Sequence, residues 1–205
     1  MSDLDSATSK SASAAAGADS HNLNDSSSTA AAVAGGQWGY GGYICCMCFS
    51  DDGQLLAGAS IVGCCFIWDA WNWQLLQMLR DPEESEIEEL YCVKFTKNSK
   101  RVVTCGKLKS RRVWSEEDED NFCIPGKIKV YDLLSGQVLL RMEGHKEEIL
   151  SLKRLSFKGE EAWLSCGQDG RIIQWKILEP EEGSSGVSYT KEFIDDTTPH
   201  YVCAL

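Results

Sequence analysis

The chain has 205 residues and a formal net charge of −11, with 31 acidic side chains against 20 Lys and Arg side chains. This length suits one or two ordinary domains. A strongly acidic chain lacks the basic field that general nucleic-acid binding requires, so we do not expect that function. No run of about eighteen consecutive apolar residues occurs, and we therefore expect no membrane-spanning helix.

Residues 1–37 consist mainly of Ser, Ala, Gly and Asp and contain few large apolar side chains. Such a segment cannot bury enough surface to offset the entropy of ordering it, so the composition predicts disorder. The segment lacks the basic and apolar regions of a secretory signal, and its Asp residues with no Arg are atypical of a transit peptide. Residues 38–205, rich in Trp, Cys, Leu and Ile, are predicted to fold.

The chain contains ten cysteines, most of them inside apolar, strand-like segments. Cysteine in that setting behaves as a small buried hydrophobic residue. No pair of C-x-x-C motifs occurs, and His21 and His200 lie in polar or terminal surroundings, so we expect no metal site and no cofactor. Free thiols suit a reducing compartment, which predicts a cytoplasmic or nuclear location.

One unit recurs three times, over residues of about 43–81, 88–143 and 145–196. Each unit has four short apolar segments joined by turns rich in Asp, Asn and Gly, which is the pattern of a propeller blade. In each unit a glycine precedes the third-strand aromatic residue by five positions. These pairs are Gly63 and Trp68, Gly126 and Tyr131, and Gly170 and Trp175. Residues 200–205 repeat the character of a first strand and are predicted to begin a fourth unit.

The predicted strands are as follows. First strands lie at 43–49, 90–95 and 149–155; second strands at 54–59, 101–106 and 162–167; third strands at 64–69, 127–132 and 171–177; fourth strands at 74–79, 137–142 and 187–193.

These units resemble WD repeats. Trp68-Asp69 matches the dipeptide that closes such a repeat, Tyr131-Asp132 is a softened copy, and Gly144-His145 matches the opening dipeptide. The resemblance implies an all-β fold, a partial WD-repeat propeller of about three blades plus the first strand of a fourth. We expect its ring to be completed by missing sequence or by a partner. The first two units depart from the pattern, with Val62 and Pro125 where the turn Asp belongs.

His145, Ser165 and Asp169 could suggest a hydrolytic triad. Ser165 lies inside a predicted strand, however, and no G-x-S-x-G motif is present. The WD-repeat resemblance implies instead that these three residues and Trp175 form a buried, structural hydrogen-bonded set. Phosphate-binding glycine loops, dinucleotide-binding motifs and zinc-protease motifs are also missing from the sequence, so we do not expect an enzyme.

The connection between the second and third strands of the second unit, residues 107–125, is much longer than its counterparts. We predict that it projects without regular structure, either as a partner-binding loop or as a solvated insertion. Its candidate binding residues are Lys107, Lys109, Arg111, Arg112, Trp114, Glu116, Glu117 and Asp118. Ser115, which precedes acidic residues, is a candidate phosphorylation site. The acidic runs 81–89, 116–120 and 179–182 are predicted to be solvated loops. The WD-repeat resemblance implies that 81–89 lies on the same face as 107–125.

The resemblance implies a non-enzymatic protein–protein interaction scaffold or an adaptor subunit of a multiprotein complex. The alternative is a substrate-recognition or regulatory subunit of an enzyme complex such as a ubiquitin ligase. WD-repeat adaptors of cullin-4 ligases favour an Arg two residues after the Trp-Asp dipeptide. Here Trp68-Asp69 is followed by Ala70 and Trp71, which disfavours that alternative. The expected partners are other proteins.

Overall fold

The computed structural model describes residues 42–84, 88–109, 123–157, 159–180 and 186–195. The predicted disordered segment 1–37 and the predicted strand 200–205 lie outside these residues. So does most of the candidate loop, with Arg111, Arg112, Trp114, Ser115, Glu116, Glu117 and Asp118.

The described residues form three antiparallel sheets and no helix. In each sheet the strands pair in chain order, as neighbouring strands joined by tight turns do. The first sheet contains β1 (Ile44–Phe49), β2 (Leu55–Ser60), β3 (Cys64–Asp69) and β4 (Leu75–Arg80). The second contains β5 (Glu88–Phe95), β6 (Arg101–Lys109), β8 (Lys127–Asp132) and β9 (Val138–Glu143), with β7 (Cys123–Ile124) paired to β6. The third contains β10 (Ile149–Phe157), β11 (Glu160–Gly167), β12 (Ile172–Leu178) and β13 (Ser188–Asp195).

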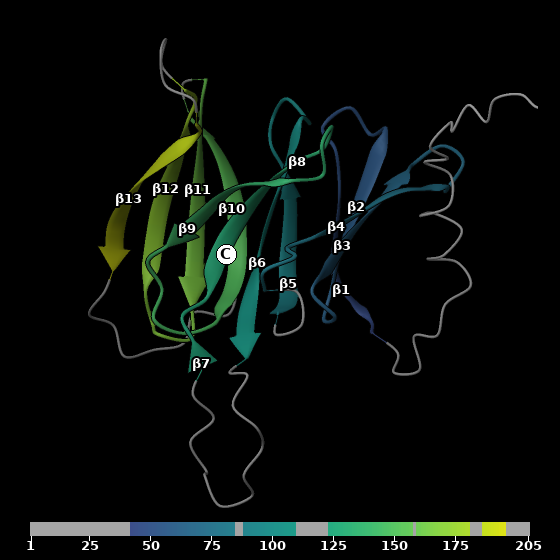
Figure 1. Ribbon diagram of the computed structural model, residues 1–205. Coiled ribbons are helices and arrows are strands. Elements are labelled where there is room, and N and C mark those ends of the chain that lie inside the picture. Colours follow the sequence, from purple (N-terminus) through teal and green to yellow (C-terminus); the bar gives the residue numbers. More distant parts are fainter. Residues whose placement is uncertain (1–41, 85–87, 110–122, 158, 181–185, 196–205) are drawn as a thin grey trace, which may run out of the picture.

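The three sheets stack side by side as blades, which we call blades 1, 2 and 3 in chain order (Figure 1). Strand β5 of blade 2 contacts β1 and β2 of blade 1 on one side and β10 of blade 3 on the other. The first strands of the blades therefore lie together, and the later strands extend outwards. This arrangement confirms the predicted all-β fold and the partial propeller.

Blade 2 supplies one wall of each of two hydrophobic cores, because successive side chains of a strand point to opposite faces. Val102 and Tyr131 pack into the core shared with blade 1, where they meet Ala57, Ile67 and other buried residues. Val103 packs into the core shared with blade 3. The alternating pattern of the sequence thus fixes blade stacking as well as strand formation.

Two of the predicted third strands, 64–69 and 127–132, have the observed bounds. The prediction for 107–125 is wrong at both ends. Strand β6 continues to Lys109, and its last residues pair with β7 through Leu108–Ile124 and Lys109–Cys123. It also pairs with the start of β5 through Glu88–Leu108 and Glu89–Lys107. Residues at both ends of this segment, which the composition assigns to a loop, therefore form backbone hydrogen bonds within a sheet.

No helix in the described part of the chain is long and apolar enough to cross a membrane.

Candidate functional site

The structure brings His145, Ser165, Asp169 and Trp175 together in blade 3. His145 precedes β10, Ser165 lies in β11, Asp169 lies in the following turn, and Trp175 lies in β12. The His145 Nε2 atom is 2.7 Å from Ser165 Oγ, and the His145 Nδ1 atom is 2.9 Å from Asp169 Oδ1. The Trp175 indole donates to Ser165 Oγ over 2.8 Å. Ser165 and Trp175 are fully buried, and His145 is 3% exposed.

The protonation states of this set follow from its hydrogen bonds. Burial would raise the pKa of Asp169, but hydrogen bonds from the Lys146 amide and His145 outweigh that effect and hold it below its usual value. Burial lowers the pKa of His145, although the Asp169 hydrogen bond opposes this. A neutral His145 therefore donates a hydrogen bond from Nδ1 to Asp169 and accepts one at Nε2 from the Ser165 hydroxyl. Because Ser165 is inaccessible and fully engaged, the set links strands and is not arranged to attack a substrate.

The other two blades lack this set. In every blade the pairing of first and second strands shifts register at the same place, between Ile44 and Cys46, Leu90 and Cys92, and Ile149 and Ser151. When the three sheets are compared from this shared irregularity, Ser165 corresponds to Thr104 in blade 2 and to Gly58 in blade 1. A Cβ atom added to Gly58 would lie 2.8 Å from Trp68 Cζ3, so the Trp68 ring occupies the space that a hydroxyl side chain would need.

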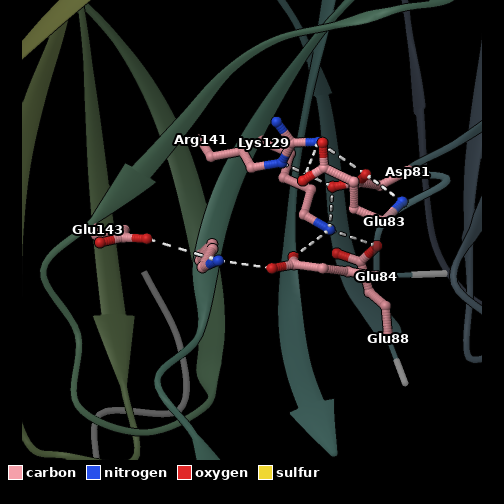
Figure 2. Close-up of polar contacts among 8 residues, drawn as sticks. Asp81, Glu83, Glu84, Glu88, Lys129, Arg141 and Glu143 are labelled. Carbon is pink, nitrogen blue, oxygen red and sulfur yellow. Dashed lines mark hydrogen bonds and ion pairs between the residues drawn. The ribbon is translucent and has the colours of Figure 1, made fainter. Parts of the chain in front are cut away.

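Blade 2 carries a buried cluster of charges instead (Figure 2). The Lys129 Nζ atom lies 2.9 Å from Asp81 Oδ2, 2.8 Å from Glu84 Oε2 and 2.8 Å from Glu88 Oε2. Lys129 and Asp81 are fully buried. The Arg141 guanidinium group holds Asp81 through two hydrogen bonds of 2.9 and 2.8 Å. We refer to Asp81, Glu84, Glu88, Lys129 and Arg141 as the ion cluster.

The ion cluster fixes the connection between two blades. Asp81 and Glu84 follow β4, the last strand of blade 1, and Glu88 begins β5. Lys129 and Arg141 lie on β8 and β9 of blade 2. Lys127, also on β8, adds a 2.6 Å ion pair to Glu84. The segment that joins blades 1 and 2 is therefore held against blade 2 by paired charges.

One ammonium group serves three carboxylates in the ion cluster, and this sets their pKa values. Burial would raise the pKa of Asp81, but Arg141 and Lys129 outweigh burial and hold it well below its usual range. Burial raises the pKa of Glu88 to about 7, with Lys129 opposing the rise and Asp81 and Glu84 adding to it. Burial would lower the pKa of Lys129, but Glu88, Glu84 and Asp81 raise it, so the ammonium group stays charged.

The prediction that 81–89 is a solvated acidic loop is therefore wrong for Asp81 and Glu88, which are 0% and 6% exposed. The acidic run gave no sign of its partners, because Lys129 and Arg141 lie far away in the sequence. One signal could have pointed to the cluster. Lys129 stands between Ile128 and Val130 in an otherwise apolar strand, at a position where a side chain should be buried.

Two lysines at the end of β6, just before the long connection, are also paired with carboxylates. Lys109 forms an ion pair with Glu89, and the Lys107 Nζ atom lies 3.8 Å from Glu148 Oε2. The Tyr91 hydroxyl lies within hydrogen-bond distance of both Glu89 and Glu148. Lys107 and Lys109, the first two candidate binding residues of this connection, are therefore paired with carboxylates of the blades.

The thiols follow the sequence prediction in part. Cys64, Cys65, Cys105 and Cys166 are buried and Cys46, Cys48 and Cys92 are half-buried, but Cys45 is exposed, contrary to that prediction. Cys45 lies on β1, where the neighbouring Ile44 and Met47 are also exposed, so an apolar strand does not guarantee burial of its side chains. Among the described residues, no group of three or more His, Cys, Asp or Glu side chains is arranged to hold a metal ion.

Stacked antiparallel blades that carry a His–Ser–Asp–Trp set define the class of WD-repeat propeller proteins. A comparison with protein families agrees, because the family described as "WD domain, G-beta repeat" matches residues 36–69 and 136–176. The second match includes β9 of blade 2 and β10 to β12 of blade 3, so this repeat joins two neighbouring blades. The chain therefore contains WD40 repeats.

A similar curated protein is a WD repeat-containing protein 91 homolog from Dictyostelium discoideum. The two are 38% identical over 56 residues, which are 27% of this chain and 7% of that protein. The aligned stretch thus spans a small part of the length of this relative.

Proposed function

We propose that the chain is a non-enzymatic interaction scaffold, an adaptor subunit that holds other proteins in a multiprotein complex. WD40 repeats generally mediate protein–protein interaction, and the family match supports a role in protein binding. In the described part of the chain, the polar side chains of the blade 3 set and of the ion cluster bind one another within the blades. Partner contacts are then expected from the connections at the ends of the blades.

The observation that carries the proposal is the extension of β6. This strand has nine residues, against six in β2 and eight in β11; it continues three residues past Gly106, where the registers place the ends of β2 and β11, and its end pairs with β7. The connection 110–122 therefore starts and ends on a paired stem that only blade 2 has among the described blades. Its sequence places Arg111, Arg112 and Trp114 before an acidic run, and Trp and Arg are enriched in binding hot spots. We propose this connection as a partner site.

The test is affinity purification of the native full-length protein followed by mass spectrometry. The variant replaces 110–122 with a Gly-Ser linker of equal length, and the matched control replaces 181–185 in the same way. We expect the first variant to lose one set of partners while its melting temperature stays unchanged. If it retains every partner, the connection is not a binding site. A partner set dominated by ubiquitin-ligase subunits would favour a substrate-recognition role.

Ser115 and the cellular location are tested in the same cells. We propose Ser115 as a substrate of an acidophilic kinase, because Glu116, Glu117 and Asp118 follow it. Phosphopeptide mapping decides this, with Ser115→Ala as the control. We also propose a cytoplasmic or nuclear location, which imaging of the tagged full-length protein tests directly.

A further inference from the structure

The turn between β3 and β4 of blade 1 exposes two tryptophans. Trp71 is 93% exposed and Trp73 is 61% exposed. Trp73 also has a φ of 61°, in the left-handed region that side chains other than glycine rarely adopt. A residue with a Cβ atom loses about 1–2 kcal/mol in this conformation. Blade 1 therefore combines exposed aromatic surface with local backbone strain.

The equivalent turn of blade 2 shows that the fold does not require this strain. There the amide of Gly136 donates to the Asp132 carbonyl over 2.9 Å, and in blade 1 the Trp73 amide donates to the Asp69 carbonyl over the same distance. Gly136 has a φ of 72° and meets the geometry without strain. The same turn thus uses glycine in one blade and tryptophan in the other. Strained residues of this kind cluster at functional sites.

Carboxylates outnumber cations in this turn and in the turn beside it, where Asp51 pairs with Arg154 over 2.6 Å and Asp52 and Asp69 stand in addition. The Asp69 carboxylate accepts the Trp71 amide over 2.7 Å. The neighbouring turn is joined to this one by the Ala70 amide, which donates to the Gln54 carbonyl over 2.8 Å. Asp52 lies in that neighbouring turn and is exposed; the Ser50 hydroxyl holds the pKa of Asp52 below its usual value, so it stays ionised. Within the described ranges, neither Asp52 nor Asp69 forms an ion pair with Lys or Arg.

We propose that Trp71, Trp73, Asp52 and Asp69, together the tryptophan turn, bind a Lys- or Arg-bearing segment of a partner protein. A cation stacks on the face of an indole ring, and an adjacent carboxylate neutralises it. Tryptophan contributes large rigid contact area to protein interfaces. The inference rests on the proposed role in protein binding and names the chemistry of one partner.

This site is separate from the connection 110–122. The tryptophan turn follows the end of β3 beside the start of β2, since Leu55 pairs with Asp69. In blade 2 the matching end of β8 lies beside the start of β6, since Arg101 pairs with Asp132. Residues 110–122 follow the other end of β6. The tryptophan turn and Lys109, after which the connection 110–122 begins, therefore lie at opposite ends of the blades.

The test measures fluorescence anisotropy of a labelled synthetic peptide of alternating Lys, Gly, Arg and Ser, with a Glu-substituted peptide for comparison. The full-length protein is compared with Trp73→Gly and with a Trp71→Ala, Trp73→Gly double variant. Leu134→Ala is the matched control, because Leu134 is 96% exposed and occupies the position of Trp71 in the blade 2 turn. None of these substitutions changes the net charge.

We expect the double variant to bind the basic peptide about tenfold more weakly, a change of about 1.4 kcal/mol. Leu134→Ala should bind like the wild type, and Trp73→Gly should melt at a higher temperature because the strain is relieved. Equal binding by the double variant, or no binding by the wild type, overturns the proposal. Replacing 110–122 should leave peptide binding unchanged. If the peptide-binding test fails, the proposal that the connection 110–122 binds partners is therefore unaffected.

Discussion

Replacing Lys129 with Met tests whether the ion cluster holds blade 1 to blade 2. Methionine keeps most of the apolar volume of the lysine stem, so the change removes mainly the charge. Three carboxylate oxygens within 2.9 Å then lose their shared ammonium group, and Asp81 is fully buried. Removing one partner of a buried ion pair costs about 3–5 kcal/mol. Because Arg141 still holds Asp81, we expect a loss near the lower end, about 3 kcal/mol.

Urea denaturation at pH 7 measures the free energy of unfolding, and Lys127→Met is the matched control. Lys127 lies on the same strand and pairs with the same Glu84 over 2.6 Å, but its side chain is 22% exposed. A partly exposed pair contributes about 1 kcal/mol or less. A Lys129→Met variant that loses no more than the Lys127→Met control would refute the reasoning, because burial would then not govern the energy of the cluster.

The pH dependence of Lys129→Met provides a second check. Without the ammonium group, the pKa values of the neighbouring carboxyl groups should rise in the folded state. When folding raises the pKa of a carboxyl group, the free energy of unfolding of the protein falls as the pH increases from the unfolded pKa towards the folded pKa. The deficit of the variant should therefore shrink when the pH is lowered from 7 towards 5. A deficit that stays constant over this range contradicts the electrostatic explanation.

Three further expectations follow from the structure. Asp169→Ala should lower the free energy of unfolding by about 1–3 kcal/mol, because it leaves the His145 and Lys146 donors unpaired; a loss below about 0.5 kcal/mol in urea denaturation would argue against this. Glu88, with its pKa raised to about 7, should destabilise the wild type increasingly between its unfolded pKa near 4.5 and pH 7. The free energy of unfolding of Glu88→Gln, relative to that of the wild type, should therefore rise by about 1–3 kcal/mol between these two pH values. Curves of unfolding free energy against pH that run parallel for the two proteins would rule this out. The 205-residue chain should bind a hydrophobic dye at pH 7, because Met47 and Phe49 of β1 and the preceding Tyr43 are 61%, 55% and 64% exposed; a monodisperse monomer that leaves the dye unbound would contradict it.

Local pattern was sufficient to predict the blades. The Gly170 to Trp175 spacing, the alternation in the third strands and the turn residues depend on neighbours close in the chain, so the strand order could be derived without coordinates. The blade 3 set was predicted through the resemblance to WD repeats, and in the structure its residues are linked in series: Asp169 to His145, His145 to Ser165, and Ser165 to Trp175.

The errors about charged side chains share one physical cause. Asp81 and Glu88 were predicted to lie in a solvated loop because charged side chains are usually exposed. Both meet opposite charges from other strands. Asp81 pairs with Lys129 and Arg141, and Glu88 pairs with Lys129. No window of the sequence contains both members of these pairs.

The sequence by itself therefore determined the strands, the turns and the stacking of apolar faces, because these follow from side-chain period and backbone conformation. Only the tertiary structure decided which charges are buried and which aromatic residues remain exposed. Burial of an ion depends on every atom that displaces water around it, and its energy depends on counter-charges brought within about 3 Å. Lys129 in an apolar strand and Trp71 in a turn show both outcomes. The lysine is fully buried, and the tryptophan is 93% exposed.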